Sequence, residues 1–421
     1  MRLQDLTDHS YYILLAVLSY LDRRDLARLS VTTSSLLDIC RDRMVQHVEF
    51  HGTLKFPLST YASFCRFMLC KPSRLLLLET LFVNLTACYT ELDDLGELDA
   101  MLGLDEPAEL RVTELLETLL APLLESAVNL SRLTIAGVGD LESFPALKTA
   151  LVAAFARTRT LKLTGRNLIE LLRHMLQLYH TIPLSRLFLQ LRPGERWVDI
   201  WRLLEPCRNT LTYLAIDLGA LDGSPIPPLE SSDPWPLMSE LAIFSYMPPV
   251  AQIFTSQTLR MVFPNLQHLR IPSGAVSRDE AAEGECEWGT LLSFSGHART
   301  MVSLAFNCQL LELNLDGDNW ALYQPRFPNS ARHLYTAFRL GQPRCFSFEI
   351  FDVCTPFDED LEDELCRPSL WSDALHMEYA HLTITEGPCC SRLLEFLVRS
   401  TLRISASCTV LLPITLPIDL P

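Results

Sequence analysis

The sequence is short of glycine, of basic residues and of paired cysteines. Glycine occurs 16 times in 421 residues, below the usual share of about 7%, and no G-x-G-x-x-G or G-x-x-x-x-G-K-[ST] loop is present. Lys and Arg number 35 against 51 Asp and Glu, so the net charge of -16 repels nucleic acid and anionic membranes. None of the 13 cysteines forms a C-x-x-C pair. We therefore expect no nucleic-acid partner and no zinc site. We also expect the cysteines to be reduced thiols, as in a cytoplasmic or nuclear protein.

Long hydrophobic runs are also absent. The apolar run YYILLAVLSYL near the N-terminus is preceded by Asp5 and Asp8 and followed at once by charged residues. It is too short to cross a bilayer, which needs about 18 or more apolar residues, and no other stretch reaches that length. We expect neither a signal peptide nor a membrane segment.

What the sequence does contain is a repeated leucine pattern, L-x-x-L-x-[LI]. It occurs as LSRLTI, LSRLFL, LTYLAI and LQHLRI, with TRTLKL and MSELAI as near matches. Successive copies lie 26 to 28 residues apart, and their fourth positions are Leu133, Leu161, Leu187, Leu214, Leu241 and Leu269. Weaker copies occur around Val48, Leu81 and Leu313. Similarity at a fixed period indicates stacked structural units.

Each unit is predicted to be a strand followed by a helix. The two apolar residues of L-x-L lie on one face of a strand, and stretches such as 166–181 have helical apolar spacing. We predict an α/β leucine-rich-repeat solenoid over residues 46–421, a horseshoe with parallel strands on the concave face and helices on the convex face. Acidic insertions are expected near 91–126, 275–290 and 355–367.

A closed α/β fold is the alternative architecture, since strand-helix units also build doubly wound sheets and barrels. Strands buried on both faces read as continuous apolar runs. Here the residue between or after the two leucines is often polar, as at Lys162, Gln190 and Arg270. The pattern favours an open sheet with one wet face.

The first 45 residues form a separate pattern of three short predicted helices. The first runs from Ile13 to Leu21, Asp22 can cap the second, and Ser34 can cap the third. So small a piece cannot bury its own apolar surface well. We expect it to dock against the solenoid or another protein.

The stretch ILLAVLSYLDRRDL followed by ARLSV resembles the F-box family. The positions that match are Ile13, Leu14, Val17, Leu18, Leu21, Asp22, Asp25 and Leu26. The resemblance implies a small three-helix F-box at 1–45 that precedes the leucine-rich repeats, an order known for F-box proteins. It also implies contact with a Skp-family adaptor, and through it a cullin, by Ile13, Leu14, Val17, Leu18, Leu21 and Leu26.

The function that this resemblance implies is substrate recognition in an SCF-type cullin-RING ubiquitin ligase. The target is expected on the outward strand positions Lys162, Phe188, Gln190, Asp217, Phe244, Arg270 and Asn314, since exposed aromatic residues among polar ones often mark interaction sites. The acidic segments 91–99, 277–287 and 357–365 favour a basic partner, if they are more than solvated loops.

Two other functions stay open. One is an F-box-like, leucine-rich scaffold that acts without a ligase; the other is a hydrolase or transferase in a closed α/β fold. The sequence has no G-x-S-x-G, Cys-His or kinase signature. His47, Glu49 and His51 lack further ligands for a metal. We therefore expect no enzyme activity, no cofactor and no metal.

Overall fold

The computed structural model describes most of the repeat region and the N-terminal helices. The described residues are 14, 16–18, 20–21, 23–32, 34–50, 58–84, 113–138, 141–165, 168–179, 182–190, 200–217, 233–244, 254–271, 276–277, 286–304, 306–316, 336–337, 339–351, 379–385 and 409–411. They fall into two compact units. Unit 1 comprises Met1–Glu195 and Leu203–Thr210, and unit 2 comprises Arg196–Arg202 and Leu211–Pro421.

The N-terminal helical segment (residues 14–46) opens unit 1. Residues 14 and 16–18 are helical, and α2 (Arg23–Ser30) and α3 (Ser34–Gln46) follow. Helices α2 and α3 pack against each other. Helix α3 then continues directly into strand β1 (His47–Phe50), so the boundary predicted near residue 45 lies at the end of a helix. That boundary stays a prediction.

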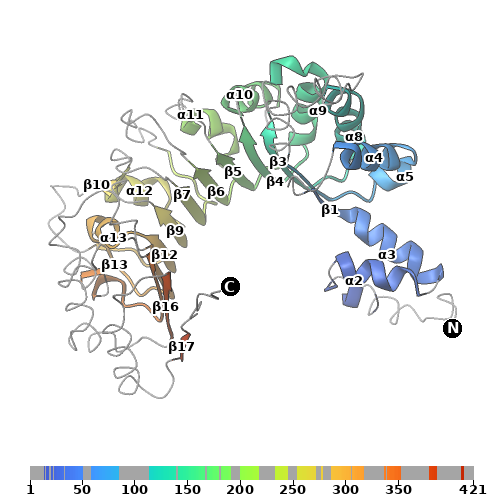
Figure 1. Cartoon of the computed structure of the whole chain (residues 1–421). Coiled ribbons are helices and arrows are strands. Elements are labelled where there is room, and N and C mark those ends of the chain that lie inside the picture. The colour runs from blue at the N-terminus through green and yellow to red at the C-terminus, as the bar shows by residue number, and fades with distance from the viewer. Residues whose placement is uncertain are drawn as a thin grey trace, which may run out of the picture. The chain divides into compact units, whose positions relative to one another are not determined.

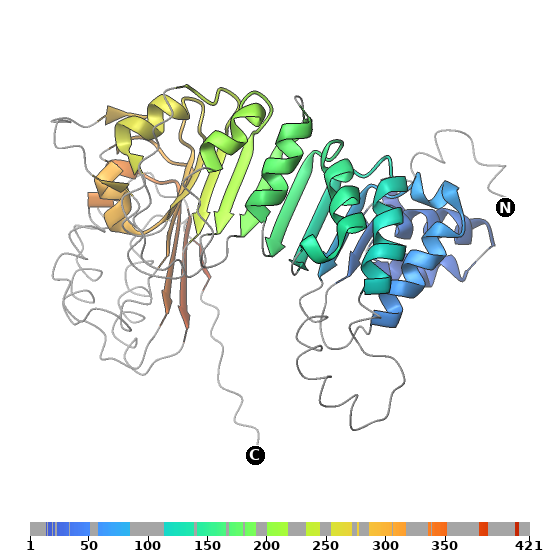
Figure 2. The same cartoon turned by 90° about the horizontal axis from the view of Figure 1, so that it is seen from above.

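Unit 1 contains a parallel sheet of five described strands in the order β1-β2-β3-β4-β5. The strands after β1 are β2 (Thr80–Asn84), β3 (Arg132–Val138), β4 (Thr160–Gly165) and β5 (Arg186–Gln190). The helices are α4 (Leu58–Leu69), α5 (Pro72–Leu75), the π-helix η2 (Glu114–Leu120), α8 (Ala121–Ser126), the 3-10 helix η3 (Leu141–Ser143), α9 (Pro145–Phe155) and α10 (Leu168–Leu178). Figure 1 and Figure 2 show α8, α9 and α10 along one face of these strands.

Leucine alternation creates the core between this sheet and its helices. Leu133, Leu161 and Leu187 occupy one register row, and all three are buried. The residues on the opposite face of the strands are half-buried or exposed. The predicted strands and the parallel sheet are therefore confirmed, and the sheet has one covered and one open face.

The π-helix η2 and α8 lie within the insertion predicted at 91–126. Their leucines Leu116, Leu123 and Leu124 are fully buried, and η2 packs against α4 and α9. Residues 114–126 are thus part of the helical layer of unit 1. The acidic segment 91–99 lies outside the described residues, as does 357–365.

Unit 2 contains a parallel sheet of eight described strands in the order β6-β7-β9-β12-β14-β15-β16-β17. Their bounds are β6 (Tyr213–Asp217), β7 (Glu240–Phe244), β9 (His268–Ile271), β12 (Ser293–Gly296), β14 (Glu312–Asp316), β15 (Cys345–Phe351), β16 (Tyr379–Thr385) and β17 (Thr409–Leu411). Leu214, Leu241 and Leu269 again form a buried register row. Strand β12 fills the gap of 44 residues between the sequence copies at Leu269 and Leu313.

Shorter elements complete unit 2. Helices α12 (Ser256–Val262) and α13 (Ala298–Leu304) belong to it, together with two pairs of two-residue parallel strands. The pairs are β8 (Phe254–Thr255) with β10 (Val276–Ser277) and β11 (Cys286–Glu287) with β13 (Phe306–Asn307). Trp201, Trp235 and Phe263 pack with ring centroids 5.8 to 6.5 Å apart. Trp201 lies in α11 (Ile200–Leu204). The last two residues of α11 and the 3-10 helix η5 (Glu205–Cys207) that follows belong to unit 1.

A backbone ladder joins neighbouring strands just before they begin. The carbonyl of Glu79 accepts hydrogen bonds from the N–H groups of Ser131 and Arg132, at 2.9 and 3.0 Å. The carbonyls of Ser131, Arg159, Thr212, Ser239, Gln267 and Leu292 each accept two N–H groups from the next strand in the same way. Some serines add their hydroxyl, as Ser131 does to Glu79. Buried backbone groups at this edge are therefore satisfied.

Candidate functional site

The core of the N-terminal helical segment uses part of the predicted adaptor-binding set. Leu18 and Leu26 are buried with Cys40, and Leu14 and Leu21 pack against them while remaining half-buried. Ile13 lies outside the described residues. Because Leu18 and Leu26 face this small core, their first role is to hold the helices together, and their contact with an adaptor stays a prediction.

Other apolar side chains of the segment face solvent. Val17 is 51% exposed, Tyr20 89%, Val31 82% and Leu37 43%. Of these four residues, only Val17 is in the adaptor-binding set that the F-box resemblance implies. These four side chains leave apolar surface of the segment exposed to solvent. The ion pairs Asp25–Arg28 and Asp38–Arg41 are exposed and add little stability.

The open face of unit 1 consists of three register rows. The first contains His47, Thr80, Arg132, Thr160 and Arg186, and the second contains Glu49, Phe82, Thr134, Lys162 and Phe188. The third contains Asn84, Ala136, Thr164 and Gln190. Of the predicted target-binding residues, Lys162 is exposed and Phe188 and Gln190 are half-buried. The sheet brings these three together on adjacent strands β4 and β5.

Lys162 and Phe188 contact each other on this face. The ammonium group of Lys162 lies 4.4 Å from the centre of the Phe188 ring, a cation–π distance. The two residues are register partners on β4 and β5. The Lys162 side chain that makes this contact is exposed.

At the β1 edge, the face carries an uncharged histidine near neutral pH. His47 Nδ1 lies 3.1 Å from Thr80 Oγ1. Burial is the main cause that lowers the pKa of His47, and the positive charge of Arg43 lowers this pKa further. Since the lowered pKa favours the neutral ring, His47 contributes polarity rather than charge at pH 7.

The open face of unit 2 contains the remaining predicted target-binding residues. The Arg270 guanidinium lies 4.6 Å from the centre of the Phe244 ring, and Asn314 is half-buried on β14. Asp217 differs from the expectation of an outward, accessible side chain. It is only 4% exposed, and its neighbour on the same face, Ala215, is fully buried. The face of β6 is covered in this structure, so the Asp217 carboxylate is not accessible to a target.

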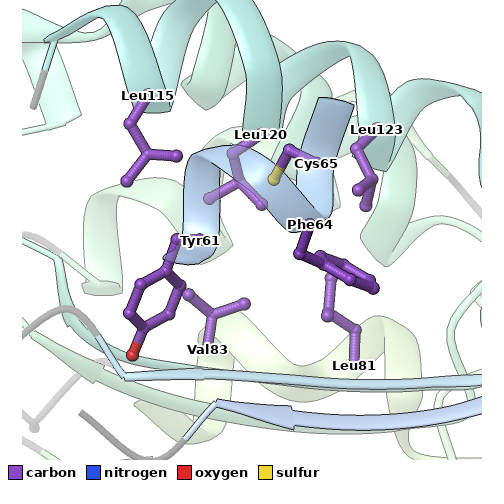
Figure 3. Close-up of a pocket in the computed structure, with 8 residues that line it drawn as sticks. All are labelled: Tyr61, Phe64, Cys65, Leu81, Val83, Leu115, Leu120 and Leu123. Carbon is purple, nitrogen blue, oxygen red and sulfur yellow. The ribbon is translucent and has the colours of Figure 1, made fainter. Parts of the chain in front are cut away.

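The described residues of unit 1 enclose a small apolar cavity. Among them, no cluster of three or more His, Cys, Asp or Glu side chains could hold a metal. Figure 3 shows the cavity between α4, η2, α8 and strand β2, which is lined by apolar side chains such as Leu81, Leu115 and Leu123. Its volume of about 10 Å³ holds at most one water. Burial raises the pKa of the Cys65 thiol there to about 12, which leaves it unreactive at neutral pH.

Comparison with known protein families detects an F-box domain in residues 4–46, the part of the chain that contains the N-terminal helical segment. No curated protein matches the chain. F-box domains generally bind Skp-type adaptors within SCF complexes, and proteins that carry them are typically adaptors rather than enzymes. Within the described part of the chain, no helix is long and apolar enough to cross a membrane.

Proposed function

We propose that the protein is a substrate-recognition subunit of an SCF-type cullin-RING ubiquitin ligase. The observation that carries the proposal is the F-box domain at residues 4–46. In this proposal the N-terminal helical segment binds a Skp-family adaptor, and through it a cullin. The remainder of the chain binds the protein to be ubiquitinated, in the cytoplasm or the nucleus.

The repeat architecture supports the second half of the proposal. We interpret residues 46–421 as an irregular leucine-rich-repeat solenoid. In both units parallel strands recur with a buried leucine row and a more polar opposite face. Such a face offers many side chains at regular spacing to one protein ligand. The mechanism is then proximity, because a target held near the conjugating enzyme reacts at a raised effective concentration.

The exposed apolar residues of the N-terminal helical segment support the first half. Val17 and Val31 project apolar surface into solvent while Leu18 and Leu26 hold the core. This division of roles assigns adaptor contact to Val17, Tyr20 and Val31, with Leu14 and Leu21 at the edge of the core. A substitution at Leu18 tests folding, whereas a substitution at Val17 tests contact.

The first prediction therefore compares two equally exposed valines. Val17→Asp is expected to weaken binding of the full chain to a purified Skp-family adaptor at least tenfold, because a charge replaces desolvated apolar contact. Val128→Asp is the matched control, since Val128 is 54% exposed in unit 1 outside the segment. Isothermal titration calorimetry measures both affinities, and circular dichroism checks that both variants remain folded.

Three results would decide against the proposal. If the wild-type chain does not bind the adaptor, the ligase assignment fails. If Val17→Asp binds as well as Val128→Asp, the adaptor does not use this surface. A chain that binds the adaptor but yields no cullin complex supports the non-ligase scaffold instead.

A further inference from the structure

The charge of the open face of unit 1 is opposite to that of the chain. Arg132, Lys162 and Arg186 are exposed on the adjacent strands β3, β4 and β5. Among the described residues of the three register rows, Glu49 on β1 is the only acidic side chain. The whole chain has a net charge of -16, so a local excess of positive charge here is not a consequence of composition.

The register fixes how these three charges are spaced. Arg132, Thr160 and Arg186 are successive partners in one row, and Lys162 lies two residues further along the central strand. Neighbouring strands are about 4.8 Å apart, and residues i and i+2 of a strand are about 6.6 Å apart. The three side chains therefore start from the corners of a triangle with sides of roughly 8 to 10 Å.

An extended peptide presents carboxylates at a similar spacing. Side chains at i and i+2 of an extended chain point the same way about 6.6 to 7 Å apart, and long Arg and Lys side chains can adjust by a few ångströms. Around the charges, the face offers hydroxyl groups at Thr80, Thr134, Thr160 and Thr164, which can donate to carboxylates. The half-buried Phe188 ring beside Lys162 supplies apolar contact.

We propose that this basic face, defined by Arg132, Lys162 and Arg186, binds an extended acidic segment of the target protein. The inference rests on the proposed function, since it names the kind of target segment that a receptor of this type would select. The acidic target segment has the opposite charge to the basic partner that the acidic segments of the sequence predicted. Charge complementarity favours a carboxylate-rich ligand, because a basic segment would meet repulsion from all three side chains.

The test uses three fluorescein-labelled peptides of equal length on the full chain. One alternates Glu with Thr, one replaces each Glu by Gln, and one replaces each Glu by Lys. Fluorescence anisotropy is expected to show binding of the Glu peptide, weakening as NaCl rises from about 50 to 300 mM. The Gln and Lys peptides are expected to bind at least tenfold more weakly.

Matched double variants locate the binding. Arg132→Gln with Lys162→Gln is expected to weaken binding of the Glu peptide at least tenfold. Lys71→Gln with Arg173→Gln removes the same charge from the helical layer of unit 1 and is expected to leave the affinity within twofold. All four residues are at least partly exposed, and thermal melting confirms that each variant is folded.

Four results would overturn the inference. Two concern the peptides: no binding of the Glu peptide at millimolar concentration, or equal binding of the Gln peptide. The other two are an equal loss of Glu-peptide affinity in both double variants, and tighter binding of a thymidine oligonucleotide than of the Glu peptide. The same samples are titrated with the Skp-family adaptor. If the wild-type chain binds the Glu peptide but not the adaptor, the ligase assignment is refuted and this inference is not. Intact adaptor binding without selective peptide binding refutes this inference alone.

Discussion

Gly296 occupies a position in unit 2 that only glycine fits. Its φ of +149° lies outside the range of ordinary side chains, and an added Cβ would lie 2.2 Å from the Ile271 carbonyl oxygen. Gly296 pairs with Ile271 and Leu315 on the strands to either side of β12. The close approach of backbone to backbone thus depends on the missing side chain.

We predict that Gly296→Ala lowers the free energy of unfolding by at least about 2 kcal/mol, from backbone strain and the clash with Ile271. Gly289→Ala is the control, because an added Cβ there has no neighbour within 4 Å, and it should change stability by less than about 0.5 kcal/mol. Urea denaturation measures both. Equal effects would mean that β12 does not hold Gly296 in this conformation.

Val17 and Leu18 show that the sequence alone does not tell which of two adjacent apolar residues is buried. Both match the F-box pattern, so both entered the adaptor-binding set that the resemblance implies. The structure buries Leu18 and exposes Val17. Which apolar neighbour is buried depends on how α2 and α3 close over the first helix, and that packing is not readable from spacing alone.

At the scale of the element, the N-terminus of helix α9 is capped by a carboxylate from another helix. Glu117 of η2 accepts hydrogen bonds from the N–H groups of Ala146 and Leu147, with N–O distances of 3.0 and 3.3 Å. These N–H groups lie in the first turn of α9, where they have no partner within the helix. The negative charge also stabilises the positive end of the helix dipole.

Removal of this cap gives the next prediction. Glu117→Ala should lower the free energy of unfolding by about 1 to 2 kcal/mol, as loss of an N-terminal cap does. Glu114→Ala removes only an exposed ion pair with Arg66, 3.2 Å long, and should cost less than about 1 kcal/mol. Thermal and urea denaturation report the difference. If the two variants are equally stable, the cap contributes nothing measurable.

Strand prediction succeeded at the six regular copies and at the weaker copies around Val48, Leu81 and Leu313, and it failed at β12. The six copies with a central leucine are all strands, because a buried row needs an apolar residue at each repeat. Strand β12 was missed since Phe294 and Gly296 occupy the positions of its two leucines. Phe294 is nevertheless fully buried between Leu269 and Leu313 in the same row.

Of the three residues that define the basic face of unit 1, only Lys162 was predicted. Lys162 was selected because it lies between the two leucines of its copy. Arg132 and Arg186 directly precede the fourth-position leucines of their copies, Leu133 and Leu187, and were not selected, although an alternation of two places them on the same face as Lys162. Their common row became evident once the register joined β3, β4 and β5.

At the scale of the whole molecule, the chain combines two kinds of surface. The N-terminal helical segment exposes apolar residues, which suit a stable partner. The open face of unit 1 exposes charged and hydroxyl side chains, which suit selection among ligands by charge. The presence of both surfaces on one chain supports the proposed adaptor role.

The central claim is that the N-terminal helical segment binds a Skp-family adaptor while the sheets remain available to a target. Hydrogen exchange of the full chain, read by mass spectrometry with and without purified adaptor, tests it most directly. The account predicts slower exchange in peptides from residues 14–46 and unchanged exchange in β2 to β5. Unchanged exchange throughout, or slowing confined to the strands, would contradict it.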